Sequence, residues 1–439
     1  MLSATAAIIL CLVVLFALLV IGAPIAICLL TSGLVGLLSF EGWEMLNNVA
    51  GKIAFSHVAG YSLLAVPMFI LMGNLLLTHH MGEDMYDAIY RWFGRVPGGL
   101  AIGSTVVCAF FGFMSGSNTA ASATIGAVAL PEMEKKGYDR KLALGTLAVA
   151  GTLAALIPPS TIMIIYGVNV SGVSIGKVFV GGIIPGWILT AFMAIYIFTY
   201  AKIYPNSAPS AGISYPLKDK LRLLPRLTPV VVLFLAIIGG MFFGVWTAIE
   251  ASAASVFVSL VMIISYGRFS ISALIVAVKR TVKISGMIYM LIIGANIMGY
   301  LFFVTGFQDA VSNFILQFSL PPWGNMLLIL LILTILGCFL DVIALITITV
   351  PVFLPIAIAS GYDDVWFGVI MTVASEMALC TPPVGVNLFV VQGIAPKGTS
   401  LLTVSKGAAP YIGVIWVLLV LLIKYPELVN WLPSIMSGR

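Results

Sequence analysis

Long apolar stretches dominate the chain, and short polar or charged breaks separate them. A stretch of about 20 apolar residues is long enough to cross a bilayer as a helix. Several stretches are shorter than that, and the short ones come in adjacent pairs. The expected apolar segments are 3–22, 24–40, 61–80, 98–116, 117–131, 142–157, 160–170, 176–201, 227–245, 247–266, 284–305, 324–340, 342–359, 365–380, 384–394 and 402–424. The pattern predicts an all-α integral membrane protein with many spans.

The paired short segments divide at polar or proline-containing sequences. Two pairs divide at "SGSNT" (115–119) and "FLD" (339–341), and two divide at "IPPS" (157–160) and "TPPVG" (381–385). Proline removes a backbone donor and frees a carbonyl, which hydrocarbon tolerates only where the freed group is buried in protein or lines a cavity. We therefore expect two re-entrant hairpins with polar tips and two helices broken at Pro-Pro.

The second half of the chain repeats the first at an offset of 224 residues. Between 128–159 and 352–383 there are 11 identities in 32 positions without a gap. The identities include both prolines of each break and the Gly-Tyr-Asp triplet at 137–139, which are not common filler in membrane helices. The same offset aligns Ser117 with Asp341. Internal repeats of this kind are typical of secondary transporters.

Basic residues indicate how the two repeats are oriented, because short cytoplasmic loops carry an excess of Lys and Arg. The loop 132–141 has four Lys or Arg, whereas its equivalent, 356–365, has none and two Asp. With 132–141 in the cytoplasm, the basic loops 202–226 and 267–283 also fall inside, and 306–322, which has no Lys or Arg, falls outside. The repeats are therefore predicted to have inverted topology. The side of the N-terminus is left open.

These patterns divide the chain into five parts. Two amphipathic, charge-bearing pieces, 82–96 and 306–319, suit helices that lie at the membrane interface as arms. The predicted parts are scaffold helices with an interfacial arm (1–96), a first transport repeat (97–204, with hairpin 97–136 and broken helix 142–170), a cytoplasmic loop with scaffold helices (205–283), a scaffold helix with a second arm (284–320), and a second transport repeat (321–439, with hairpin 321–360 and broken helix 365–394).

The composition agrees with a membrane protein that is not an enzyme. Of the 439 residues, 61% are apolar and 8% are charged, against about 25% charged in soluble proteins. The five Cys lie in apolar segments without CxxC spacing, which argues against a metal or disulfide framework. No P-loop, HExxH or GxSxG motif occurs. Basic cytoplasmic loops explain the net charge of +5, so no nucleic-acid partner is expected.

The hairpin tips and the breaks carry oxygen atoms that suit a hard cation. The first tip, "SGSNTAAS" (115–122), offers Ser, Asn and Thr side chains around a glycine that permits a tight turn. The second tip offers Asp341, an ionisable group that indicates function at membrane depth, although a helix cap is the alternative and the two roles can coexist. The prolines either free carbonyls toward these tips or only kink the helices. Two repeats suggest two similar cation sites.

Two further acids lie within apolar segments, and basic residues are absent from the hairpins and broken helices. Glu250 and Glu376 each have three open roles: proton site, cation ligand or paired structural group. No Lys or Arg occurs within 100–130, 142–176 or 284–396. Helix N-termini and bound cations would therefore have to neutralise an anionic substrate there. Such an arrangement links substrate binding to cation binding, as symport requires.

Three stretches carry a resemblance to a known family. "GFMSGSNTAASATIGAVALPEMEKKGYDRKLA", the "IPPS" break and "TPPVGVNLFV" resemble the large, DctM-like membrane subunit of the tripartite ATP-independent periplasmic (TRAP) transporters. The resemblance covers essentially the whole chain. One departure is visible, because the family pattern Thr-Pro-Thr-Glu-Ala reads Thr-Ala-Ile-Glu-Ala at 247–251 here.

The resemblance implies a Na⁺-driven importer of organic acid anions in a bacterial inner membrane. It implies an elevator mechanism, in which a hairpin-bearing transport domain slides against a scaffold. It also implies a small four-helix membrane subunit and a periplasmic substrate-binding protein as partners. The nearest alternative is a self-sufficient Na⁺/dicarboxylate symporter of the divalent-anion family, and a passive anion channel is a more distant one. The substrate is left open among C4-dicarboxylates, sialic acid, sulfonates and other organic acids.

The family's Na⁺ sites, carried onto this sequence, lie where each tip meets a Pro-Pro break, so that two or more Na⁺ ions would bind. The anion is expected between the two tips. The predicted sodium ligands are Ser115, Ser117, Asn118, Pro158, Asp341, Thr381, Pro382 and Gly385. The predicted substrate-binding residues are Ser117, Asn118, Thr119, Ser160, Asp341 and Asn387.

Overall fold

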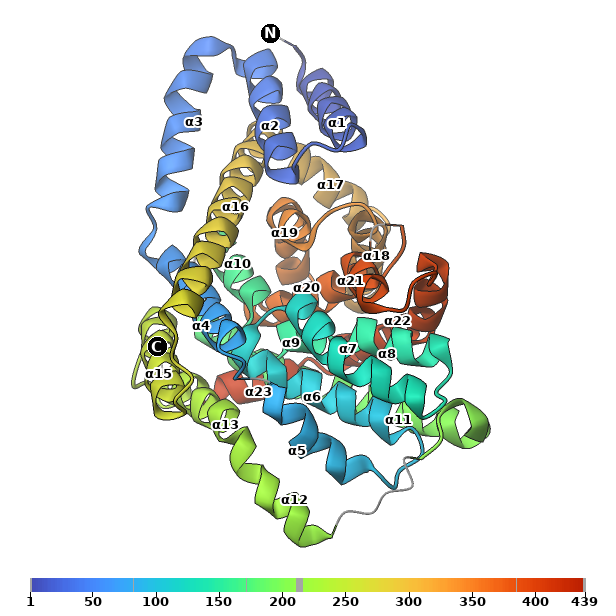
Figure 1. Ribbon diagram of the computed structural model, residues 1–439. Coiled ribbons are helices and arrows are strands. Elements are labelled where there is room, and N and C mark those ends of the chain that lie inside the picture. Colours follow the sequence, from blue (N-terminus) through green and yellow to red (C-terminus); the bar gives the residue numbers. More distant parts are fainter. Residues whose placement is uncertain (1, 82, 171, 211–215, 384, 437–439) are drawn as a thin grey trace.

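The computed structural model describes residues 2–81, 83–170, 172–210, 216–383 and 385–436, and the regular elements among them are all helices (Figure 1). Seven of these helices are long and apolar enough to cross a membrane, or eight if the bent pair Arg140–Leu156 and Thr161–Asn169 counts as one span. The predicted all-α, multi-pass fold is confirmed.

Three N-terminal helices, α1 (Ala4–Val20), α2 (Ile25–Glu41) and α3 (Trp43–Val58), lie at the top of Figure 1. Two of them, α2 and α3, pack on the second half of a long helix, α16 (Ile271–Val304), and the third, α1, packs on α2. Glycines allow α2 and α16 to approach closely, since a Cβ on Gly294 would lie 2.8 Å from the backbone nitrogen of Leu30. Their apolar side chains form a small core of their own. Small residues at a helix interface are typical of membrane proteins.

The long helix and α3 differ from the expected segments. The sequence indicated an apolar segment at 284–305, but α16 begins at Ile271 and includes Lys279, Arg280 and Lys283. Lys and Arg are good helix formers, and their long stems carry the charge away from apolar surroundings, so a basic stretch need not end a helix. A helix of 34 residues is about 51 Å long, which exceeds the hydrocarbon thickness of about 30 Å. The segment of α3 was missed because its polar residues interrupt the apolar run.

One helix packs on the first half of α16 and is covered in turn by another, and the predicted arms fold as short helices. The helix α4 (Ala65–Thr78), with a 3₁₀ turn before it (Tyr61–Leu64), packs against α15 (Ala248–Ser265) and α16. The arms are α5 (Glu83–Phe93) and α17 (Phe307–Leu316). Their position at the membrane interface stays a prediction.

Each expected hairpin consists of two helices joined by a short turn, and each expected broken helix consists of two or three helices. That the hairpins re-enter the membrane stays a prediction. The hairpins are α6–α7 (Gly99–Ser115 and Asn118–Lys135) and α18–α19 (Pro322–Gly337 and Val342–Ala359). The first broken helix consists of α8 (Arg140–Ala150), α9 (Leu153–Leu156) and α10 (Thr161–Asn169), and the second consists of α20 (Asp364–Ala378) and α21 (Val386–Ile394). The first bends by 47° at its break.

The two halves of each broken helix pack on different hairpins. The first halves, α8 and α20, each contact both helices of the hairpin that precedes them in the chain. The second halves pack on the hairpin of the other repeat. The helix α10 packs on α19, and α21 packs on α7. The contact pattern is thus the same in both repeats, and each hairpin is held by helices from both halves of the chain.

The remaining helices surround this interlocked centre. They are α11 (Ile175–Ile203), α12 (Leu217–Leu223), α13 (Thr228–Phe234), a π-helical turn (Leu235–Gly239), α14 (Gly240–Phe242), α22 (Leu401–Lys424) and α23 (Glu427–Ser434), with 3₁₀ turns at Pro205–Ser207 and Leu224–Leu227. The helix α22 packs on α8, and α11 packs on α6, α20, α22 and α23.

Hydrogen bonds join three of the segments that connect the helices. Asp139 N donates to Ser207 O at 2.7 Å, and Arg140 Nη2 donates to Pro396 O at 3.4 Å. These segments carry the basic residues that predict a cytoplasmic position. Elsewhere, Tyr166 Oη of α10 donates to Asp364 O at the start of α20 at 2.6 Å. Inverted topology itself stays a prediction.

Candidate functional site

The tip of the first hairpin lies directly against the first Pro-Pro break. The helix α6 ends at Ser115, and Gly116 follows in the left-handed region with φ 55°. A Cβ on Gly116 would come within 2.4 Å of Pro159 O. Only glycine fits here without displacement, because it lacks a Cβ and adopts positive φ freely. The tip of the first hairpin therefore lies directly against the backbone of the first Pro-Pro break.

Three predicted ligand residues of the first tip are neighbours. Ser117 N donates to Ser115 Oγ at 3.3 Å, and the hydroxyls of Ser117 and Thr119 are 3.3 Å apart. The Ser117 hydroxyl also accepts a hydrogen bond from Ala120 N at 3.4 Å and so caps α7. Several side-chain oxygens thus gather where the positive end of the α7 dipole points.

The fourth polar residue of this tip, Asn118, faces the other half of the chain. Its Nδ2 donates to both carboxylate oxygens of Glu376, at 3.2 and 3.4 Å. Its Oδ1 accepts from Thr119 N at 2.7 Å. Glu376 lies on α20 and is only 1% exposed. Of the three open roles of Glu376, pairing with a polar group is the one seen directly, and the sequence did not indicate the partner because 258 positions separate the two residues.

The first break has an oxygen-rich turn that leads into α10. The Pro158–Pro159 peptide is cis, and Ser160 follows as the cap of α10, accepting from Met163 N at 3.3 Å. Ser160 is fully buried. The carbonyl that meets the hairpin tip belongs to Pro159, whereas the sequence had indicated Pro158 as the ligand.

Asp341 begins the outgoing helix of the second hairpin. Its Oδ2 accepts from Ile343 N at 3.2 Å and so caps α19. The cap that was considered as an alternative role is therefore present, and Ser117 has the same capping position in the first hairpin. Near the end of α18, Gly337 lies against α20, since a Cβ there would be 2.3 Å from Ala378 Cβ.

The second break is more open than the first. Pro382 and Pro383 are exposed and joined by a cis peptide. Thr381 Oγ1 donates to Met377 O at 2.8 Å, which occupies the hydroxyl hydrogen and leaves the oxygen lone pairs available. Gly385 has φ 40°, and a Cβ there would lie 3.1 Å from Thr381 O. Val384 lies outside the described residues.

Asn387 connects the second break to the first repeat. Its Nδ2 donates to Ala148 O at 3.3 Å, and Cys380 Sγ donates to the same carbonyl at 3.5 Å. Asn387 is fully buried, and its Oδ1 has no hydrogen-bond partner among the described residues. An unpaired buried acceptor is unusual, which makes Asn387 a reasonable ligand position.

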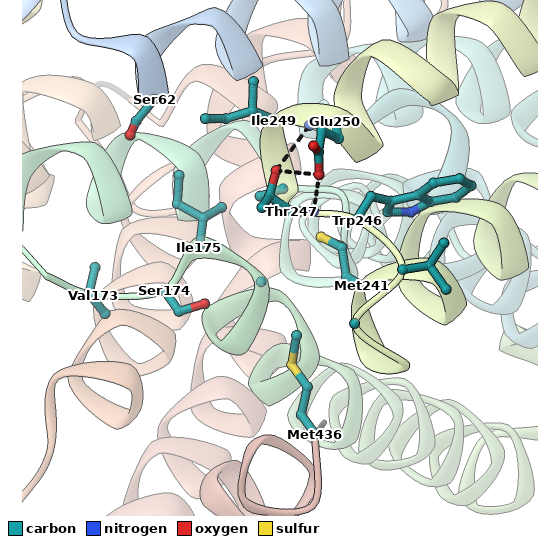
Figure 2. A pocket seen from close by; sticks show the side chains of 14 residues that line it. Ser62, Val173, Ser174, Ile175, Met241, Trp246, Thr247, Ile249, Glu250 and Met436 are labelled. Carbon is teal, nitrogen blue, oxygen red and sulfur yellow. Dashed lines mark hydrogen bonds between the residues drawn. The ribbon is translucent and has the colours of Figure 1, made fainter. Parts of the chain in front are cut away.

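Glu250 has a structural role at the start of α15. Its Oε2 accepts from Thr247 N at 2.7 Å and from Thr247 Oγ1 at 3.0 Å, and Glu250 N donates back to Thr247 Oγ1 at 3.4 Å (Figure 2). This is a complete capping box on an exposed helix end, which is the paired structural role among the three that the sequence left open. The departure from the family pattern falls on Ala248 and Ile249, which take no part in the box.

A cavity of about 480 Å³ lies beside this capping box and apart from the tips (Figure 2). It is bounded by Ser62 before α4, the start of α11, residues 241–250 and Met436. None of the predicted sodium or substrate residues lines it.

Comparison with known proteins identifies the family of this chain. Residues 12–428 match the model of the "Tripartite ATP-independent periplasmic transporter, DctM component". The chain belongs to the DctM family. It is therefore a multi-pass membrane transporter subunit and not an enzyme, as the sequence predicted.

Curated relatives of this DctM-family chain extend over nearly its whole length. It is 32% identical to a C4-dicarboxylate TRAP transporter large permease protein of Vibrio cholerae, covering 95% of this chain and 96% of the relative. It is 30% identical to an isethionate TRAP transporter permease protein of Oleidesulfovibrio alaskensis, covering 93% and 64%. It is 29% identical to an ectoine TRAP transporter large permease protein of Halomonas elongata, covering 94% and 96%.

Two solved transporter structures share the fold at low sequence identity. The Alcanivorax borkumensis YdaH transporter matches with a TM-score of 0.60 and 14% identity, covering 88% of this chain and 89% of that one. Neisseria gonorrhoeae MtrF matches with a TM-score of 0.60 and 13% identity, covering 90% and 85%.

Proposed function

We propose that this chain is the membrane-embedded carrier subunit of a Na⁺-coupled secondary transporter that imports an organic acid anion across a bacterial inner membrane. The observation that supports it most is the contact of the first hairpin tip with Pro159 O. Gly116 lies between Ser115 and Ser117 in the chain, so the Pro159 carbonyl and the side-chain oxygens of these two serines are proposed to bind the ion together. A hard cation prefers oxygen ligands of this kind.

Two Na⁺ sites follow from the two tips. The first would be held by Ser115, Ser117 and the Pro159 carbonyl, and the second by Asp341, Thr381 and Gly385. Bound Na⁺ supplies positive charge in a region whose helices carry no Lys or Arg near the tips. The anion would then bind between the tips, with Ser160 and Asn387 at the starts of α10 and α21, where helix dipoles favour negative charge.

Transport is proposed to follow an elevator mechanism with two inverted repeats. The exchange of α10 and α21 between hairpins supports it, because the exchange ties both hairpins and both broken helices into one body. That body would carry the bound ions and the anion past the scaffold of α1–α3, α4, α15 and α16. Irregular backbone at the first break would remain covered by protein, and the exposed second break would have to line a cavity.

A periplasmic binding protein and a small four-helix membrane subunit are the proposed partners. The named relatives of the chain transport a C4-dicarboxylate, isethionate and ectoine, which are all small and polar. We assign the substrate class as a small organic acid whose identity is set mainly by the binding protein.

Uptake into proteoliposomes tests this function. The chain would be reconstituted with its small membrane subunit, and a labelled organic acid would be offered with and without the purified binding protein. Uptake should require both the binding protein and an inward Na⁺ gradient. Uptake by the chain alone would support the self-sufficient symporter instead, and Na⁺-independent flux at channel rates would support a passive channel.

A further inference from the structure

We propose that Glu376 provides the negative charge that balances a cation bound at the first hairpin tip. This inference rests on the proposed Na⁺ function. Glu376 belongs to the second repeat, so one repeat would complete the ion site of the other.

The contact between Asn118 and Glu376 places this carboxylate next to the tip. Asn118 directly follows Ser117, the cap of α7, and its amide reaches both oxygens of Glu376, at 3.2 and 3.4 Å. Gly116 of the same tip lies against Pro159 O. Glu376 therefore contacts the residue that directly follows Ser117, one of the proposed ion ligands.

Among the described residues, the carboxylate of Glu376 has no recorded ion pair with a group of opposite charge. It is 1% exposed, and its hydrogen bonds within the described part of the chain come from Asn118. No Lys or Arg occurs within 100–130, 142–176 or 284–396, which hold both tips and both breaks. A buried carboxylate with only a neutral partner is unfavourable, and so is a buried cation among neutral oxygens. When the carboxylate and the cation lie close together, their attraction offsets the free-energy cost of burying each charge.

The repeat offset explains why the first tip needs an acid from elsewhere. Asp341 caps the outgoing helix of the second hairpin, and its equivalent in the first hairpin is Ser117, which carries no charge. The equivalent of Glu376 in the first repeat is Thr152, whose hydroxyl donates to Val149 O. Each tip therefore has one acid within reach, and both acids come from the second repeat.

Substitutions at Glu376 separate the charge from the hydrogen bond. Glu376→Gln keeps an oxygen that accepts from Asn118 and removes the charge, Glu376→Asp keeps the charge, and Glu376→Ala removes both. The readout is the melting temperature of the purified complex with its small membrane subunit, titrated with NaCl against choline chloride at constant ionic strength. Na⁺ that binds the folded complex stabilises it by RT ln(1 + c/Kd), where c is the Na⁺ concentration, so the melting temperature rises with the Na⁺ concentration, and a weaker site needs more Na⁺ for the same rise.

We expect Glu376→Gln to melt at or above the wild-type temperature without Na⁺, and to need about 10- to 100-fold more Na⁺ for the same shift, a range typical of residues that support metal ligands. Glu376→Asp should keep a larger part of the Na⁺ response than Glu376→Gln. Glu250→Gln is the matched control, because Gln also completes a capping box, and its Na⁺ titration should equal that of the wild type.

A wild-type Na⁺ titration for Glu376→Gln would overturn the proposal, even if Glu376→Ala lost the response, because the hydrogen bond alone would then be the relevant feature. If Glu376→Gln does not fold, the Glu376→Asp and Glu376→Ala variants are compared instead. An Na⁺ response of Glu376→Asp no larger than that of Glu376→Ala would also overturn the proposal. A wild-type complex without any Na⁺-dependent shift would contradict the proposed Na⁺ coupling itself, and this outcome is distinguishable from the others.

Discussion

Gly116 and Pro159 meet where the first hairpin tip touches the first broken helix, and a Cβ on Gly116 would lie 2.4 Å from Pro159 O. The hairpin tip thereby lies against a backbone carbonyl of the Pro-Pro break itself. In the second repeat the equivalent prolines are exposed. The two repeats therefore share a contact pattern between helices but differ in how closely each tip meets a break.

Gly116→Ala should strongly reduce Na⁺-driven uptake. The left-handed backbone at φ 55° costs an L-residue roughly 1–2 kcal/mol, and the new methyl group must also displace the Pro159 carbonyl from the tip. We expect the Na⁺ concentration for half-maximal uptake to rise about 10-fold, the change that about 1.4 kcal/mol produces. Uptake in proteoliposomes at a series of Na⁺ concentrations measures this shift.

Gly137→Ala is a matched control for this substitution. Gly137 also has a positive φ of 76°, but nothing lies within 4 Å of its Cβ position. Its Ala variant carries the backbone strain without the clash, so its Na⁺ dependence should stay near that of the wild type. Equal effects of the two substitutions would show that strain, not the contact with Pro159, is responsible.

Asp341→Asn should weaken Na⁺ activation while preserving the second hairpin. Asn is as good a helix cap as Asp, so the bond from Ile343 N is retained and only the charge is lost. Asp341→Ala should also lower stability, by about 1 kcal/mol for the lost cap. Asp363→Asn is the control, because Asp363 caps α20 through Trp366 N at 2.7 Å without lying at a tip. Near-normal transport by Asp341→Ala with unchanged Na⁺ dependence would contradict the role of Asp341.

Thr381→Val should weaken Na⁺ activation without disturbing the fold. The Thr381 hydroxyl gives its hydrogen to Met377 O, so its oxygen is free to bind a cation, and Val has nearly the same shape without that oxygen. Thr381→Ser should restore most of the activation. Measurement of uptake against Na⁺ concentration compares the three proteins. Wild-type behaviour of Thr381→Val would indicate that only the carbonyl of Thr381 acts as a ligand.

The hairpins and the breaks could be predicted from the sequence because their signals are local. Pairs of short apolar segments, the Pro-Pro sequences and the polar tips each occupy a few adjacent residues. In most of these elements, the observed helix ends differ from the expected segment ends by only a few residues. For example, α18 is Pro322–Gly337, and the expected segment was 324–340. The true start of α16 was missed because charged residues near a membrane surface do not end a helix.

Contacts between distant parts of the chain could not be predicted from local patterns. The bond of Asn118 to Glu376 and the bond of Asn387 to Ala148 O both join the two repeats. The sequence spacing of the two residues does not indicate either hydrogen bond. Each bond forms because α20 and α21 pack against the first repeat. The role of Glu250 was left open for a related reason, because an apolar run does not show where its first helical turn begins.

Gly407→Ala should destabilise the transporter by separating α22 from α8. A Cβ on Gly407 would lie 2.1 Å from Lys141 O, and one on Gly145 would lie 2.1 Å from Gly407 O, so the two backbones are in direct contact. Forcing an extra methyl group into such packing typically costs about 1–3 kcal/mol. The melting temperature should fall in the presence and absence of Na⁺ alike, because the contact lies away from both tips. Gly413→Ala is the control on the same helix, since nothing lies within 4 Å of its Cβ position, and a helical Ala there should raise stability by roughly 0.5–1 kcal/mol. A similar rise for Gly407→Ala would mean that α8 and α22 can separate without loss, and that this glycine pair does not hold the first broken helix in place.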